Sequence, residues 1–191
     1  MGKIALSQNL SLDGVMQSPG STDVPFKYRG WAVDFDTGPD SELFQLEQAQ
    51  NAGTLLLGRI TYEAMRAFWP TAEGEFADRL NELPKYVVSS TLTDPTWNAT
   101  VLGDNWLEDV TRLRNELDGE ILIYGSRRLA QALLSRGLVD ELRLLVYPVV
   151  LGTGDRLFGE TQDKIPMRLV ESRPFEGGLL GMIYAPDSPD G

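Results

Sequence analysis

Short apolar runs alternate along the chain with segments in which apolar residues recur every three or four positions. The apolar runs predict strands at 4–12, 54–57, 86–90, 121–124 and 142–151. Pro148 in the last of them is expected at a bulge or an edge, because proline cannot donate to a strand ladder. Two further runs, 168–173 and 179–185, flank Gly177-Gly178 and predict a terminal hairpin.

The helical spacing predicts helices that follow Asp40 or Ser41, Gly58, Asn105 and Ser126. Asn105 and Glu108 also have the spacing of a capping box. Apolar strands that alternate with amphipathic helices are typical of a largely parallel sheet covered on both faces. We therefore expect one domain over residues 1–191, an α/β three-layer fold whose mixed, mostly parallel sheet ends in an antiparallel hairpin.

The composition excludes several kinds of catalytic site and of partner, but it says little about the fold. The chain of 191 residues has no cysteine and no histidine, which excludes thiolate nucleophiles, catalytic triads with histidine and the usual zinc ligands. Its net charge of −11 argues against partners such as nucleic acid or an anionic membrane. The first nine residues turn polar too early for a signal peptide, so we expect a cytoplasmic protein. The apolar run at 142–151 suggests a homodimer.

Three predicted strands end in turns that are suited to phosphate groups. They are followed by Gly58-Arg59-Ile60-Thr61, Ser89-Ser90 and Gly125-Ser126-Arg127-Arg128. Glycine lets the backbone approach a phosphate, a helix start offers free N–H groups, and a guanidinium can bind a phosphate with two hydrogen bonds. Arg59 and the two serines could then bind a 2′-phosphate. Each turn alone also fits an ordinary strand end with a helix cap, and this alternative stays open.

Three acids are candidates for a catalytic role toward a small-molecule substrate. Asp13 follows the first strand, where it either faces a substrate or forms a tight turn. Asp40 and Glu42 open the first helix, where the helix dipole favours acids whatever the function. The sequence contains no calcium-loop spacing, but a magnesium or calcium site built from Asp and Glu stays open as an alternative.

The long segment 18–39 contains no predicted element, and loops of this length in small domains are usually functional. Its aromatic residues Trp31 and Phe35, like Phe68 and Trp69 further along, either pack in the interior or stack on a flat ring.

The order of several motifs resembles a known family. Ser-Leu-Asp-Gly at 11–14 is followed by Leu-Leu-Gly-Arg-x-Thr-Tyr-Glu at 56–63 and Ile-Tyr-Gly-Ser at 123–126, and then by Pro-Val-Val-Leu-Gly-x-Gly at 148–154. Together they resemble the dihydrofolate-reductase-like proteins, in particular the reductase domain of the bifunctional riboflavin-biosynthesis deaminase-reductase. The resemblance extends over residues 3–184. Ser7 departs from it, because the riboflavin enzymes usually have a lysine there.

This resemblance implies NADPH as cofactor and the reduction of a pyrimidinone- or pterin-like substrate, as by 5-amino-6-(5-phosphoribosylamino)uracil reductase. A dihydrofolate reductase proper and a nucleotide-binding protein without catalysis are the alternatives. The resemblance assigns the cofactor phosphates to Gly58, Arg59, Thr61, Gly125, Ser126 and Arg127, and the 2′-phosphate pocket to Ser89 and Ser90.

Overall fold

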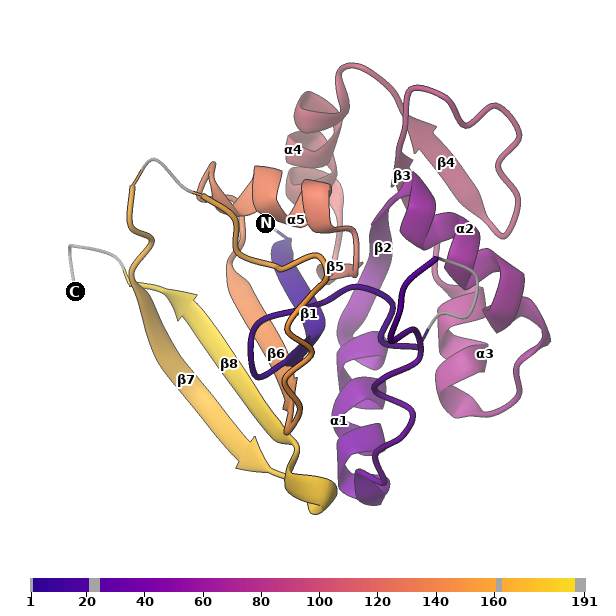
Figure 1. The fold of residues 1–191 in the computed structure, drawn as a ribbon. Coiled ribbons are helices and arrows are strands. Elements are labelled where there is room, and N and C mark those ends of the chain that lie inside the picture. The colour runs from indigo at the N-terminus through magenta and orange to yellow at the C-terminus, as the bar shows by residue number, and fades with distance from the viewer. Residues whose placement is uncertain (1, 21–24, 161–162, 188–191) are drawn as a thin grey trace.

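One eight-stranded sheet forms the centre of the computed structural model, which describes residues 2–20, 25–160 and 163–187. The strands lie in the order β4-β3-β2-β5-β1-β6-β8-β7 (Figure 1). Their bounds are β1 Lys3–Ser11, β2 Ala52–Gly58, β3 Lys85–Val88, β4 Ala99–Leu102, β5 Glu120–Tyr124, β6 Glu141–Tyr147, β7 Met167–Pro174 and β8 Leu180–Pro186.

The six strands from β4 to β6 in this order are parallel, and β1 lies among them. On one side it pairs with β5, where Ser7 lies opposite Tyr124, and on the other with β6, where Ser7 lies opposite Arg143. β8 runs antiparallel to both β6 and β7. The predicted mixed sheet with an antiparallel terminal hairpin is thus confirmed.

Helices cover both faces of the sheet (Figure 1). They are α1 Gly38–Asn51, α2 Arg59–Phe68, α3 Glu75–Glu82, α4 Trp106–Glu116 and α5 Arg127–Leu134, with short 3-10 turns η1 at Trp69–Thr71 and η2 at Glu176–Gly178. No helix within the described ranges is long and apolar enough to span a membrane.

Alternate residues of β1 divide the core into two layers. Ile4 and Leu6 pack in a cluster with residues of α4 and α5, whereas Ala5 between them packs in a cluster with residues of α1 and α3. This follows from the two-residue period of a strand, which sends successive side chains to opposite faces. Because both faces are covered, the central strands are almost continuously apolar, as the sequence pattern indicated.

A third apolar cluster fixes the long loop before α1. Trp31 is 4% exposed and Phe35 is partly buried, and both rings meet the ring of Tyr147 edge-on. The indole N–H of Trp31 donates to the carbonyl of Gln17 at 2.9 Å. For these two aromatic residues, the packing alternative is therefore the correct one.

Two predicted helix starts are wrong in detail. α1 begins at Gly38, because Pro39 fits the first turn of a helix, and Ser41 lies inside the helix with its hydroxyl donating to the Gly38 carbonyl. Asn105 does precede α4, but its side chain makes no capping hydrogen bond, so the predicted capping box does not form.

Two short elements escaped prediction. α3 buries only Ala77 and Leu80, too few residues to show a helical period, and of β4 only Leu102 is buried. β6 is shorter than expected, since it ends at Tyr147 directly before Pro148, which has no N–H to continue the ladder.

Candidate functional site

A cleft of about 1440 Å³ opens along the carboxyl ends of the parallel strands. Its walls come from β1, α1 and α2, from the turns after β3, β4 and β5, and from the start of α5. Ligands of open α/β sheets bind at this edge, because the turns and helix starts that follow the strands meet there. All three predicted phosphate turns line the cleft.

The turn after β2 and the turn after β5 are joined by hydrogen bonds. The N–H of Gly58 donates to the Ser126 hydroxyl at 2.9 Å, and the N–H of Ser126 donates to the Thr61 hydroxyl at 2.9 Å. The Ser126 hydroxyl in turn donates to the carbonyl of Tyr124 at 3.0 Å. Two segments that are far apart in the sequence therefore form one rigid unit.

The backbone conformation of this unit disfavours substitution of Gly125 by a residue with a side chain. Gly125 has φ 55° and Ser126 has φ 56°, in the left-handed region that side chains other than glycine rarely occupy. A Cβ atom on Gly125 would lie 3.0 Å from a methyl carbon of Thr61. Ser126 precedes α5, yet its side chain does not cap the helix, because the hydroxyl bonds to the other turn instead. The alternative of an ordinary cap is therefore wrong for Ser126.

Gln8 holds the same unit from β1. Its side-chain N–H donates to the Gly125 carbonyl at 2.7 Å, and the residue is 4% exposed. This role was not predictable from the sequence, because a single glutamine within an apolar strand has no recognisable pattern.

The joined turns present groups that suit an anion. The first N–H groups of α2 and α5 have no partner within their helices, and the aligned peptides of each helix give them partial positive charge. Arg59 lies at the start of α2 and pairs with Glu63 at 3.0 Å, while Arg127 pairs with Asp155 at 3.2 Å. Both arginines are partly exposed and line the cleft, so they can exchange these carboxylates for a phosphate.

Ser89 and Ser90 lie beside this unit, after β3. The Ser89 hydroxyl accepts from the N–H groups of Thr91 and Leu92 at 3.1 and 3.0 Å, which fixes the start of the following loop. Ser90 is exposed. The pair adds hydroxyl groups to the wall on the side of Arg59.

Asp13 lies outside the residues that line the cleft. Its carboxylate accepts from the Ser11 hydroxyl at 2.7 Å and from the N–H groups of Leu151 and Gly152 at 3.1 and 2.9 Å. The Ser11 hydroxyl and, to a smaller extent, the two N–H groups lower the pKa of Asp13 to about 2. These contacts connect the end of β1 to the loop after β6. A catalytic role for Asp13 stays a prediction that this geometry does not support.

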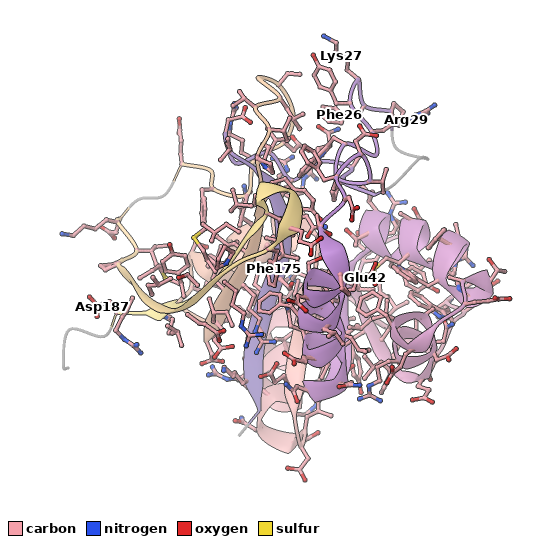
Figure 2. All side chains as sticks on the ribbon, turned by 90° about the horizontal axis from the view of Figure 1, so that it is seen from below. Phe26, Lys27, Arg29, Glu42, Phe175 and Asp187 are labelled. Atoms are coloured by element: carbon pink, nitrogen blue, oxygen red, sulfur yellow. The ribbon has the colours of Figure 1, made fainter. Side chains whose placement is uncertain are left out.

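Asp40 and Glu42 are also outside the cleft lining. Both are exposed near the start of α1, and Glu42 lies toward the end of the molecule that holds Phe175 (Figure 2). The residue of α1 that does line the cleft is Gln45, one helical turn further on. The assignment of either acid to the substrate likewise stays a prediction without geometric support.

Neutral polar side chains form the floor of the cleft next to α1. They are Ser7 and Asn9 from β1, Gln45 from α1 and Tyr124 from the end of β5. The Tyr124 hydroxyl is buried without a hydrogen-bond partner among the described residues, and burial raises its pKa well above the ordinary value. The phenol therefore keeps its proton at any physiological pH.

Apolar side chains complete this part of the cleft. Met65, Phe68 and Trp69 come from the end of α2 and from η1, and Phe76 comes from α3. Phe68 is 60% exposed, although the other aromatic residues near it are at least partly buried. For Phe68 and Trp69, the alternative of stacking on a flat ring thus remains open.

Comparison with known families finds one match that extends over nearly the whole chain. The model of the RibD C-terminal domain matches residues 3–180. The uncharacterized protein YyaP of Bacillus subtilis (strain 168) is 30% identical over 189 residues, which cover 95% of this chain and 94% of that protein.

Solved structures with the same fold include reductases. A putative riboflavin biosynthesis protein from Shewanella sp. PV-4 has a TM-score of 0.79 at 18% identity and covers 97% of this chain and 99% of its own. The dihydrofolate reductase of Enterococcus faecalis, solved with NADP(H) and RAB-propyl, has a TM-score of 0.67 at 18% identity over 98% of both chains. The dihydrofolate-reductase-like fold that the motifs implied is therefore confirmed.

Proposed function

Because the chain belongs to the RibD C-terminal domain family, a family of reductase-like domains, we propose that it is an NADPH-dependent reductase of a small pyrimidinone- or pterin-like substrate. The observation that carries this proposal is the unit in which the turns after β2 and β5 are joined through Ser126. It brings two helix N-termini together at one edge of the sheet, where a diphosphate would meet N–H groups from both.

The residues of the joined turns fit the cofactor. Gly58 and Gly125 let the backbone come close to a diphosphate, and the Thr61 hydroxyl, which accepts from Ser126, retains its own hydrogen for a phosphate oxygen. Arg59, with Ser89 and Ser90 beyond it, would hold the 2′-phosphate. The dihydrofolate reductase that shares this fold was solved with NADP(H), which supports the choice of cofactor.

The proposed reaction is a hydride transfer from the cofactor to the substrate within the cleft. When bound, NADPH supplies a hydride, which adds to the carbon of a carbon–nitrogen or carbon–oxygen double bond while the heteroatom takes a proton. The chain contributes by holding the two rings together on the cleft floor. Among the described residues, the acids that line the cleft are Asp104 and Asp155, and Asp155 is paired with Arg127. Water is therefore the proposed proton source.

The test is the preference for NADPH over NADH. Arg59→Ala should weaken NADPH binding about tenfold to a hundredfold, because a hydrogen bond to a charged group contributes about 1.5–3 kcal/mol. Its affinity for NADH should change little. Dissociation constants for both cofactors can be measured by the change in nicotinamide fluorescence.

Arg112→Ala is a matched control, since Arg112 is exposed and pairs with Asp109 on α4 as Arg59 pairs with Glu63 on α2. It should alter neither dissociation constant. An equal loss for both cofactors in Arg59→Ala would place Arg59 away from the 2′-phosphate. Absence of NADPH binding to the unaltered protein would overturn the proposed function itself.

A further inference from the structure

The two ends of the cleft differ in charge, and this difference restricts the substrate. Among the described residues that line the cleft, the charged side chains belong to Arg59, Arg127, Arg128, Asp104 and Asp155. The three arginines lie at the starts of α2 and α5, Asp104 lies just before α4, and Asp155 pairs with Arg127. Among the described residues of the lining, charge is thus confined to the starts of α2, α4 and α5 and to Asp155, which pairs with Arg127.

The opposite end is apolar and aromatic. Phe68 ends α2, nine residues after Arg59, which at about 1.5 Å per residue separates the two by about 13 Å along the helix. The ring centroid of Phe68 lies 5.0 Å from that of Trp69, and that of Trp69 lies 5.2 Å from that of Phe76. Phe76 in turn meets Tyr124 edge-on, with 6.5 Å between centroids. The rings form a continuous row from the mouth of the cleft to its floor.

The aromatic row is held in place by neighbouring polar contacts. The side-chain amide of Asn81 donates to the Trp69 carbonyl at 3.0 Å, which fixes the 3-10 turn after α2. Phe68 nevertheless remains 60% exposed on the cleft. An aromatic ring held in water beside a cleft gains free energy when an apolar group covers it.

The floor below the row offers hydrogen bonds without charge. The side chains of Ser7, Asn9 and Gln45 carry hydroxyl and amide groups, which can hydrogen-bond to the donors and acceptors at the edge of a neutral ring. A phosphate or a carboxylate at this end would lose its hydration without gaining a cation, which is costly. A protonated ring would likewise find no carboxylate among the described lining residues there.

We propose that the substrate is an uncharged, flat heterocycle with an aromatic or other apolar substituent, which lies against Phe68 and Trp69. The proposal rests on the proposed function, since it assumes that NADPH occupies the charged end. A substituent that carries a sugar phosphate does not fit this end of the cleft.

The experiment compares three uracils that differ only in one substituent. They are 5-amino-6-(benzylamino)uracil, its 4-carboxybenzyl analogue and 5-amino-6-(5-phosphoribosylamino)uracil. Dissociation constants are measured by quenching of tryptophan fluorescence, with and without saturating NADPH. The benzyl compound should bind at least about tenfold more tightly than either charged compound, because only it can cover the aromatic row without burying an unpaired anion.

Two exposed phenylalanines provide a matched pair of variants. Phe68→Ala should weaken binding of the benzyl compound about tenfold and leave the dissociation constant of NADPH unchanged. Phe158→Ala, at a residue that is 56% exposed and outside the cleft lining, should change neither constant. Because both side chains are more than half exposed, neither substitution removes core packing. Phe68→Arg should reverse the preference and favour the phosphorylated compound.

Two outcomes would overturn the proposal. One is tighter binding of the phosphorylated compound than of the benzyl compound to the unaltered protein, and the other is an equal effect of Phe68→Ala and Phe158→Ala. The NADPH titration separates these results from a failure of the proposed function. If NADPH does not bind, the proposed function fails, whereas NADPH binding with a preference for the charged compounds rejects only the substrate class.

Discussion

The two ends of the cleft are built in opposite ways. At one end, backbone N–H groups, two hydroxyl groups and a glycine in the left-handed region are tied together by hydrogen bonds of 2.7–3.0 Å, so that small displacements break several contacts at once. At the other end, side chains of α1, α2, η1 and α3 meet through apolar contact, which tolerates changes of shape. The comparison teaches that binding of a constant cofactor and choice of a variable substrate can be assigned to separate parts of one cleft.

The largest effect on cofactor binding is expected from one methyl group added to the joined turns. Gly125→Ala should weaken NADPH binding roughly a hundredfold, because the new Cβ would lie 3.0 Å from a methyl carbon of Thr61 and the left-handed backbone would be strained. Binding of the uncharged uracil at the other end should change far less. Isothermal titration of both ligands measures the two effects.

Gly137→Ala is the control for this strain. Gly137 has φ 64°, similar to that of Gly125, but a Cβ there would meet nothing within 4 Å. It should lower the melting temperature without a change in NADPH affinity. If both variants bind NADPH as the unaltered protein does, crowding at Gly125 is not a determinant of the cofactor site.

A smaller effect is expected from the hydroxyl that joins the two turns. Thr61→Val keeps the shape of the side chain but removes the acceptor of the Ser126 N–H, and with it a donor for a phosphate. NADPH affinity should fall about tenfold, as expected for one or two hydrogen bonds. Thr111→Val is the control, since Thr111 lies on the exposed face of α4 and its hydroxyl donates to the Leu107 carbonyl at 2.8 Å. Equal dissociation constants for the two variants would contradict the role of Thr61.

The smallest effect on binding is expected at Asp13, where stability should change instead. Asp13→Asn removes a charge that accepts from Ser11, Leu151 and Gly152, and should lower the melting temperature at pH 7 by about 2–4 °C. NADPH affinity should stay within about twofold. Turnover, once a substrate is known, should also persist. A large loss of turnover with unchanged stability would restore Asp13 as a catalytic residue.

The pH dependence of stability gives a second measurement for the same residue. The pKa of Asp13 is lowered to about 2 in the folded protein, whereas the pKa of an aspartate in an unfolded chain is about 3.9. The stabilisation is therefore fully present above about pH 5 and is lost progressively as the pH falls through 4 toward 2. Acid unfolding should show this component in the unaltered protein and lack it in Asp13→Asn.

The contrast between the two ends also explains what the sequence could predict. The turns at Gly58 and Gly125 were found because each consists of consecutive residues directly after an apolar run, a pattern that local reading detects. That the two turns bond to each other through Ser126 was not predictable, because it depends on β2 and β5 lying next to each other in the sheet.

None of the three acids proposed for the substrate lines the cleft, and the reason is physical. The acids chosen there, Asp13, Asp40 and Glu42, were selected by residue type and by closeness to an element boundary. The side chains that line the cleft are instead amides and hydroxyls such as Gln45 and Tyr124, which occur singly inside regular elements. These side chains lie together only because α1 packs on the sheet, and no spacing of residues along the sequence indicates this.

The position of β1 in the sheet has a consequence for how the protein is made. β1 leaves the ribosome before the other strands of this sheet, but both its partners, β5 and β6, begin only at Glu120 and Glu141. At about 5–20 residues per second, β1 waits roughly ten seconds for its first partner to be synthesised. Because such distant pairing also closes a long loop, we expect the chain to fold slowly. The cleft, whose floor includes Ser7 and Asn9 of β1, forms only after β5 and β6 have been synthesised, so binding of the proposed cofactor would report a late stage of folding.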